Sequence, residues 1–296
     1  MSAKVPANEG RFITASDGVR LHVRTTGQGE PLVFVHEFSG DHRSWDQQVA
    51  FFGRHAQCVT YGARGYTPSD VPAAAAAYSQ DRAAEDVADV IRTLGLGPAH
   101  VIGLSMGGFA TLHFGLRFPE LARSLVVAGC GYGAKPEQQP DYGNRMRTEA
   151  DHADSIGMAA FAAELAGSPY AMPLRAKDAQ GWSTFASQLA EHSVRGTAMT
   201  LRSVLATRPS LWHIEDRLRR LQVPTLLLVG DEDDPCLEPN LYLKRTIPGA
   251  ALCVLPRAGH LANLEDPAAF NEVIFRFVCA VDSGRWSGWV GRDLGH

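Results

Sequence analysis

The sequence lacks the features that direct a chain to membranes, nucleic acid or secretion. No apolar run approaches the length of a membrane span, and the N-terminus has neither the apolar core nor the cleavage site of a secretory signal. The formal net charge is only −4, and no block of like charge is long enough for a nucleic-acid-binding arm. We therefore expect a soluble, cytoplasmic protein whose partner is a small molecule, not nucleic acid or a membrane.

Cysteine is also scarce. The chain has 5 cysteines and no Cys-x-x-Cys pair, so we expect neither a zinc site nor a redox site. Three of the cysteines, Cys58, Cys253 and Cys279, lie in apolar runs. We interpret them as small buried hydrophobic residues in a reducing compartment.

Short apolar runs alternate with amphipathic stretches along most of the chain. The runs that predict buried strands are 32–35, 58–61, 99–103, 124–128, 224–229 and 251–255. Because polar residues do not alternate within them, we expect a sheet that is covered on both faces. Two earlier segments, 11–14 and 19–25, do alternate and are separated by Asp17-Gly18, which predicts a hairpin at one edge.

Helical spacing occurs between these strands. Apolar residues of the segment 84–94 recur at helical intervals, with Ser79 as a plausible N-cap, and 267–280 forms a second amphipathic stretch. Alternating strands and helices predict an α/β fold with a mostly parallel, twisted sheet and helices on both faces.

The alternation is interrupted once. From 131 to 211 the sequence is rich in Ala, Gly, Met and aromatic residues and shows helical pieces without clear strands. We interpret this segment as a helical lid inserted into one core domain, whose two parts are 1–130 and 212–296.

One serine has the sequence context of a nucleophile. Ser105 is the centre of Gly103-Leu104-Ser105-Met106-Gly107, between a predicted strand and a predicted helix over 109–118. A serine on such a sharp turn has a strained backbone that exposes its hydroxyl, and glycines beside it avoid collisions with adjacent backbone. The following helix also directs its N-terminal amides at this site.

A serine hydroxyl needs a base that removes its proton, and the base needs an acid that orients it. His260 follows the last predicted strand and precedes the last helix, at the edge where an open α/β sheet binds its ligand. The acid is expected from the four consecutive acidic residues at 231–234. The residues alone leave all four as alternatives.

Hydrolysis through a serine also needs backbone amides that stabilise an oxyanion. One is expected from Met106, directly after the serine, and the other from Phe38 in the loop 36–40. Further residues expected to contact substrate come from this loop and from the helical segment, namely His36, Glu37, Tyr132 and Trp182.

Together these segments resemble the α/β-hydrolase superfamily, and within it the branch of bacterial lipases, lactonases and esterases. The resemblance rests on 103–108, 230–233 and 259–267, and it extends over nearly the whole chain outside the helical segment. It implies Asp233 as the acid, because in this branch the acid usually stands three residues after the glycine that ends its strand. Serine, acid and histidine then follow one another in the order expected of this fold.

Two positions depart from the pattern of the branch. The segment 64–70 looks like its Arg-Gly-x-Gly-x-Ser turn but has Thr67 in place of the second glycine, and we expect a structural role for it. The loop that usually reads His-Gly here reads His36-Glu37, so that Glu37 is either strained or part of a different turn. A functional carboxylate there would disfavour anionic substrates or bind an amine or hydroxyl, but a solvated or structurally paired Glu37 is the interpretation we favour.

The resemblance implies a serine hydrolase that cleaves a carboxylic ester or lactone through an acyl-enzyme, without metal or organic cofactor. Haloalkane dehalogenases and epoxide hydrolases carry aspartate in place of Ser105, which argues against both activities. C–C bond hydrolases usually have tryptophan where this chain has Leu261, and the segment after His260 is closer to 3-oxoadipate enol-lactone hydrolases. The alternatives are a C–C hydrolase or perhydrolase-like activity on the same triad, and a slow-turnover ligand-binding receptor. We expect a monomer or a homodimer.

Overall fold

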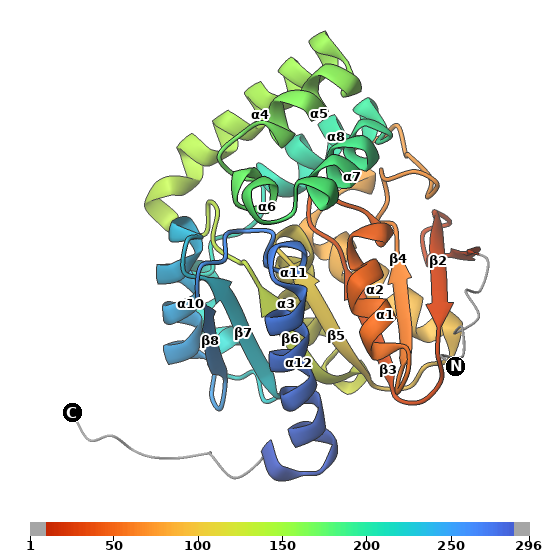
Figure 1. Ribbon diagram of the computed structural model, residues 1–296, viewed down its shortest axis with the longest axis vertical. Helices are drawn as coiled ribbons and strands as arrows, with labels where there is room; N and C mark the ends of the chain where they lie inside the picture. Colours follow the sequence, from red (N-terminus) through yellow and green to blue (C-terminus); the bar gives the residue numbers. More distant parts are fainter. Residues whose placement is uncertain (1–9, 287–296) are drawn as a thin grey trace.

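Eight segments of the chain pair into one sheet in the order β1-β2-β4-β3-β5-β6-β7-β8 (Figure 1). The computed structural model describes residues 10–286. The strands are β1 (Arg11–Thr14), β2 (Arg20–Thr26), β3 (Pro31–Val35), β4 (Gln57–Tyr61), β5 (Ala99–Leu104), β6 (Ala122–Ala128), β7 (Thr225–Gly230) and β8 (Ala251–Leu255). β2 pairs antiparallel with β1 and β4, whereas the strands from β4 to β8 pair parallel with their neighbours. The predicted α/β fold and its edge hairpin are confirmed.

Helices cover both faces of the sheet, and this explains why the sequence of β3 is apolar throughout. Val33 and Val35 pack on one face with residues of α2 (Gln80–Leu94), α3 (Met106–Arg117) and α10 (Asp234–Thr246). Leu32 and Phe34 pack on the other face with residues of α1 (Asp46–Phe52) and α12 (Pro267–Asp282). Every residue of β3 is therefore buried.

Burial on both faces does not extend to the last strand. β8 is the edge of the sheet, its burial is only partial, and Val254 is exposed. For the same reason Cys253 is only half-buried, and Cys279 is half-buried on α12, whereas Cys58 is buried as expected. The interpretation of all three as buried hydrophobic residues is thus wrong for two of them.

The chain between β6 and β7 is helical. Its elements are α4 (Gln139–Ile156), α5 (Met158–Ala166), α6 (Met172–Lys177), α7 (Ala179–Ala190), α8 (Val194–Thr200), the π-helical turn η5 (Leu201–Leu205) and α9 (Glu215–Leu218). α4 to α8 lie together above the carboxyl ends of the parallel strands (Figure 1). They share a hydrophobic cluster of their own, which Met106 and Leu261 join from the sheet side.

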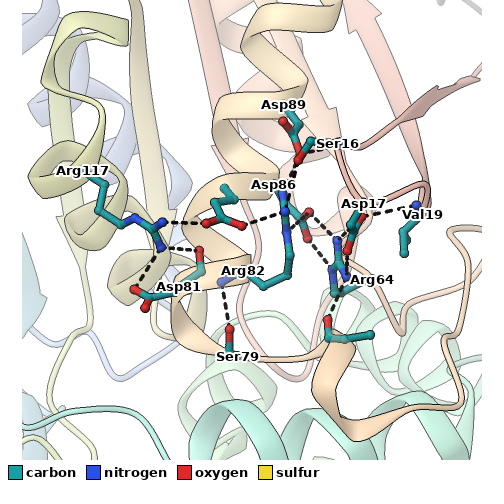
Figure 2. A network of polar contacts seen from close by, with 12 residues as sticks. Ser16, Asp17, Val19, Arg64, Ser79, Asp81, Arg82, Asp86, Asp89 and Arg117 are labelled. Atoms are coloured by element: carbon teal, nitrogen blue, oxygen red, sulfur yellow. Dashed lines mark hydrogen bonds and ion pairs between the residues drawn. The ribbon is translucent and has the colours of Figure 1, made fainter.

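The turn 64–70 is anchored by a buried arginine. Arg64 donates to both carboxylate oxygens of Asp86 at 2.7 and 2.8 Å, and it also pairs with Asp17 in the β1–β2 turn at 2.7 Å (Figure 2). Arg82 extends the network along α2 through Asp86 and Asp89. These bonds connect the hairpin, the turn and α2, which supports the structural role expected for this segment.

The described helices include none that is both long and apolar enough to cross a lipid bilayer.

Candidate active site

Three of the candidate residues follow neighbouring strands at the same edge of the sheet. Ser105 follows β5, Asp233 follows β7 and His260 stands in the turn after β8. Between them, β6 ends at Ala128, and Gly129 follows it. Parallel strands bring their carboxyl ends together, so residues that are far apart in the chain meet here.

Ser105 occupies a strained turn. Its φ and ψ angles are 55° and −113°, and it is one of two described non-glycine residues with positive φ. Glycine is required on both sides, because a Cβ on Gly103 would stand 2.1 Å from the carbonyl oxygen of Gly107, and one on Gly107 would stand 2.0 Å from that of Val35. The strained serine expected from the sequence motif is therefore present.

Asp233 and His260 form a buried hydrogen-bonded pair. The distance between Oδ2 of Asp233 and Nδ1 of His260 is 2.7 Å, and the two residues are 3% and 5% exposed. The turns that carry them are in close contact, because a Cβ on Gly230 would stand 2.0 Å from the carbonyl oxygen of Ala258. With Nδ1 donating to the carboxylate, Nε2 of the neutral imidazole is left as an acceptor.

The other acidic residues of the cluster 231–234 have different positions. Asp231 is exposed, and its carboxylate accepts from the amide of Ala258 at 3.1 Å. Glu232 is exposed as well, and Asp234 is the first residue of α10. Of the four, Asp233 is the one that the structure brings to the histidine.

Ser105 and His260 approach the same residues at the end of β6. The amide of Ser105 donates to the carbonyl oxygen of Ala128 at 2.8 Å. A Cβ on Gly129 would stand 3.4 Å from Cε1 of His260. Ser105 and His260 therefore lie beside the consecutive residues Ala128 and Gly129 at the end of β6.

The loop 36–40 lies against the first turn of α3. A Cβ on Gly107 would also stand 2.7 Å from the carbonyl oxygen of His36. Tyr66 holds the loop from the other side, because its hydroxyl donates to the carbonyl oxygen of Phe38 at 2.9 Å. Within residues 10–286, the backbone amides of Phe38 and Met106 have no hydrogen-bond partner. Two amides without a partner thus lie in segments that Tyr66 contacts together, since its hydroxyl is also 3.9 Å from Sδ of Met106.

Comparison with known proteins assigns the fold to a family. A model of the α/β hydrolase fold matches residues 30–267. The chain belongs to the α/β-hydrolase family. It is 27% identical over 277 residues to a putative 2-succinyl-6-hydroxy-2,4-cyclohexadiene-1-carboxylate synthase of Bacillus subtilis, covering 91% of this chain and 98% of that protein.

Two further comparisons agree. This α/β-hydrolase is 27% identical over 278 residues to 3-oxoadipate enol-lactonase 1 of Acinetobacter baylyi, covering 91% of this chain and 97% of that protein. A solved structure of a hydrolase from Pseudomonas aeruginosa has a TM-score of 0.80 and 26% identity, covering 92% of this chain and 99% of that one. The predicted resemblance to α/β-hydrolases of the esterase and lactonase type is confirmed.

Glu37 of this α/β-hydrolase is neither solvated nor strained in the left-handed region. It is 0% exposed, and the described non-glycine residues with positive φ do not include it. Oε1 accepts from the hydroxyl of Ser44 at 3.2 Å, while Oε2 has no hydrogen-bond partner in the described part of the chain. Burial raises the pKa of Glu37 to about 7, and the nearby His260 lowers it in part. The structural pairing that we favoured is thus present for one oxygen and absent for the other.

Two residues expected to contact substrate are committed to other contacts. The ring of His36 uses both nitrogens within the protein, since Nε2 accepts from the amide of Ala63 at 2.9 Å and Nδ1 bonds the carbonyl oxygen of Glu37 at 2.7 Å. Burial lowers the pKa of His36 to about 4. The indole nitrogen of Trp182 donates to the carbonyl oxygen of Ala166 at 2.8 Å, inside the helical segment.

Two tyrosines contact the histidine. The ring of Tyr132 stands edge-on to His260 with a centroid distance of 4.9 Å, as a substrate-side position would require. Tyr170, which the sequence did not single out, lies 5.1 Å from His260, and its hydroxyl bonds that of Ser39 at 2.6 Å. Nothing in the sequence distinguishes Tyr170 from the other aromatic residues of the helical segment.

Glu265 was also missed, although it organises the histidine turn. Its carboxylate accepts from the amides of Gly259 and Leu261 at 2.6 and 3.1 Å, which are the two residues beside His260. Lys177, at the end of α6, lies 3.6 Å from the same carboxylate and also bonds the carbonyl oxygen of Arg257. The helical segment is thereby connected to the turn that carries the histidine.

A cavity of about 200 Å³ opens beside the loop 36–40. Ser39, Gly40 and Ser44 line one side of it, and Leu174 and Phe185 of the helical segment line the other. Its lining residues come mainly from the loop, from α1 and its approach, and from the helical segment, and they do not include Ser105, Asp233, His260, Phe38 or Met106.

Proposed function

We propose that this α/β-hydrolase cleaves carboxylic esters or lactones through a Ser105-His260-Asp233 triad and an acyl-enzyme. The observation that carries the proposal is the buried Asp233–His260 hydrogen bond next to a serine with positive φ. The Acinetobacter relative is named as a lactonase, which supports the choice of bond.

Each group has a defined role in the proposed mechanism. The hydroxyl of Ser105 attacks the carbonyl carbon while Nε2 of His260 accepts its proton, and Asp233 stabilises the imidazolium that forms. The amides of Phe38 and Met106 stabilise the oxyanion. His260 then returns the proton to the leaving alcohol, and a water molecule that it activates hydrolyses the acyl-enzyme. The protein groups account for every proton transfer in this sequence.

We further propose that the segment 131–211 acts as a lid on the core formed by 1–130 and 212–296. Tyr132 and Tyr170 place aromatic rings against His260, so the lid would exclude water and shape the pocket for the acyl or alcohol group.

We further propose that the substrate enters through the cavity beside the loop 36–40, whose charges favour a neutral or cationic molecule. Arg43 is the one cationic side chain among the described residues that line the cavity, and Asp41 and Glu191 neutralise it at 2.6 and 2.7 Å. Asp46 and Asp178 line the same cavity. An additional carboxylate on the substrate would meet these two negative charges, and above about pH 7 also that of Glu37, which is buried behind Gly40 and Ser44.

A fluorophosphonate probe tests the nucleophile. It should label the wild type covalently and leave Ser105→Ala unlabelled. Ser39→Ala is the matched control, because it removes a neighbouring hydroxyl of the same site and should retain labelling. Labelling that persists in Ser105→Ala would overturn the assignment.

A substrate screen tests the substrate class. It uses esters that share one acyl group but differ in the alcohol, which is neutral, carries a trimethylammonium group or carries a carboxylate. Simple lactones complete the set. The carboxylate-bearing ester should have the lowest kcat/KM, and Glu37→Gln should reduce that discrimination. Steady-state turnover would contradict the receptor alternative, whereas a single-turnover burst without turnover would support it.

A further inference from the structure

Cys236 stands beside the proposed catalytic pair but has no part in the proposed hydrolysis. Its thiol is fully buried, and Sγ lies 3.9 Å from Nδ1 of His260 and 3.4 Å from the carbonyl oxygen of Gly129. A carboxylate oxygen of Asp233, Nδ1 of His260 and Sγ of Cys236 all lie within 4.8 Å of one another. Across residues 10–286 this is the one cluster in which three such donor atoms come so close.

The cluster also contains an acceptor that the protein does not use. Oδ1 of Asp233 is buried and has no hydrogen-bond partner among the described residues, although Oδ2 bonds His260. Buried carboxylate oxygens are normally paired. A buried carboxylate with one unpaired oxygen, a thiol and an imidazole therefore lie together in the candidate active site.

We propose that Asp233, Cys236 and His260 form an inhibitory binding site for a thiophilic divalent cation such as Zn²⁺ or Cd²⁺. Thiolate, imidazole and carboxylate are the ligands that zinc accepts in proteins, and the thiolate disfavours Mg²⁺ and Ca²⁺. Three protein ligands leave one tetrahedral position for water.

Small movements would complete the geometry. Ligand bonds of roughly 2.0–2.3 Å at a tetrahedral zinc place the ligand atoms about 3.3–3.6 Å apart. The separation of 2.7 Å between Asp233 and His260 would have to widen, and the 3.9 Å between Cys236 and His260 would have to shorten, each by about half an ångström to reach that range.

The charges of such a site are balanced. A carboxylate, a thiolate and a neutral imidazole neutralise a divalent cation, which reduces the cost of burying it. Burial and the neighbouring Asp233 raise the pKa of the Cys236 thiol well above its ordinary value, so the cation has to displace the thiol proton when it binds.

Binding would stop the proposed hydrolysis through the tautomer of His260. The metal forms bonds to Sγ, Nδ1 and a carboxylate oxygen, the thiol proton passes to solvent, and the imidazole proton moves through solvent from Nδ1 to Nε2. Nε2 then carries a hydrogen and is a donor, so it cannot accept the proton of Ser105. The ion inhibits the enzyme and takes no part in catalysis.

Direct binding is the first test, and it uses Ser105→Ala, which keeps all three ligands. Titration with Cd²⁺ should produce the ultraviolet charge-transfer band of a cadmium–thiolate bond, and equilibrium dialysis should find a single tightly bound ion. Adding Cys236→Ser should remove the band and weaken binding by at least about tenfold. Adding Cys58→Ser, which changes a buried cysteine on β4, should leave both unchanged. A band that survives Cys236→Ser, or that is lost with Cys58→Ser, would overturn the site.

Inhibition is the second test, and it rests on the proposed function. Zn²⁺ should inhibit ester hydrolysis by the wild type, a chelator should reverse the inhibition, and Cys236→Ser should be at least about tenfold less sensitive. Equal sensitivity of wild type and Cys236→Ser would contradict the proposal. If Cd²⁺ binds as described but no ester or lactone is hydrolysed, the proposed function is wrong and the metal site stands.

Discussion

Oδ2 of Asp233 and Nδ1 of His260 lie 2.7 Å apart although 26 residues separate them in the chain. The approach of the two turns after β7 and β8 makes this contact possible, because Gly230 has no side chain to separate them. A carboxylate at this position holds the imidazole in the tautomer that can accept a proton at Nε2.

Asp233→Asn should therefore lower kcat by about 10⁴-fold, because an amide at this position favours the wrong tautomer of His260. Steady-state kinetics with the best ester from the substrate screen would measure the effect. Asp231→Asn is the matched control, since Asp231 is exposed and bonds only the turn at Ala258, and it should retain most of the activity. An inactive Asp231→Asn beside an active Asp233→Asn would reverse the assignment.

The eight strands could be predicted from the sequence because buried parallel strands are apolar throughout, while the edge hairpin alternates. The same rule failed at β8, where the apolar run 251–255 forms an edge strand with Val254 exposed. Composition shows that a run is apolar but does not show which strand ends the sheet.

The site could be predicted only where chemistry and position in the fold coincide. Ser105 and His260 follow strands directly, so the topology itself indicates them. The cluster of Asp233, Cys236 and His260 gave no such signal, because its cysteine is single and its histidine belongs to another turn. The expectation of no zinc site rests on the absence of Cys-x-x-Cys, whereas the proposed site would take its ligands from two turns that the fold brings together.

Glu37 should make stability depend on pH. Burial raises the pKa of its carboxyl from an ordinary value of 4.5 to about 7, so folding favours the protonated form. Its stabilising contribution is complete below the ordinary pKa and is lost as the pH rises through 7, because the unfolded chain releases the proton first. The loss amounts to about 3 kcal/mol.

Glu37→Gln cannot ionise and should therefore become more stable relative to the wild type as the pH rises from about 5 to about 8. Urea unfolding of both proteins across this range would measure the change in their difference. Glu272→Gln, which replaces an exposed carboxyl on α12, should show only a small change. A difference between wild type and Glu37→Gln that stays constant with pH would contradict the burial argument.

Glu265 should act as a positioning residue for His260. Its carboxylate holds the amides on both sides of the histidine, so Glu265→Gln should lower kcat by about ten- to a hundredfold through misplacement of the imidazole. KM should change little, since Glu265 bonds backbone amides and not the substrate. Kinetics over a range of pH would measure both parameters.

Lys177→Met provides the comparison, because it removes the ammonium group that the helical segment places near Glu265 but leaves both amide bonds to Glu265. Its kcat should fall less than that of Glu265→Gln. If Glu265→Gln loses only thermal stability and keeps its kcat, the residue is structural alone.

The Arg64–Asp86 ion pair should contribute to stability without taking part in turnover. Both side chains are buried, at 5% and 2% exposure. Asp86→Asn removes one of the two carboxylate partners of the buried Arg64 guanidinium and should therefore lower the free energy of unfolding by about 3 kcal/mol. Arg20 and Asp70 form the matched pair at the end of the same turn, but there the side chains are 59% and 33% exposed. Asp70→Asn should therefore cost less than about 1 kcal/mol, because water already screens that pair. Urea unfolding would measure both costs, and kcat of Asp86→Asn below its unfolding transition should match the wild type, because neither Arg64 nor Asp86 bonds Ser105, Asp233 or His260.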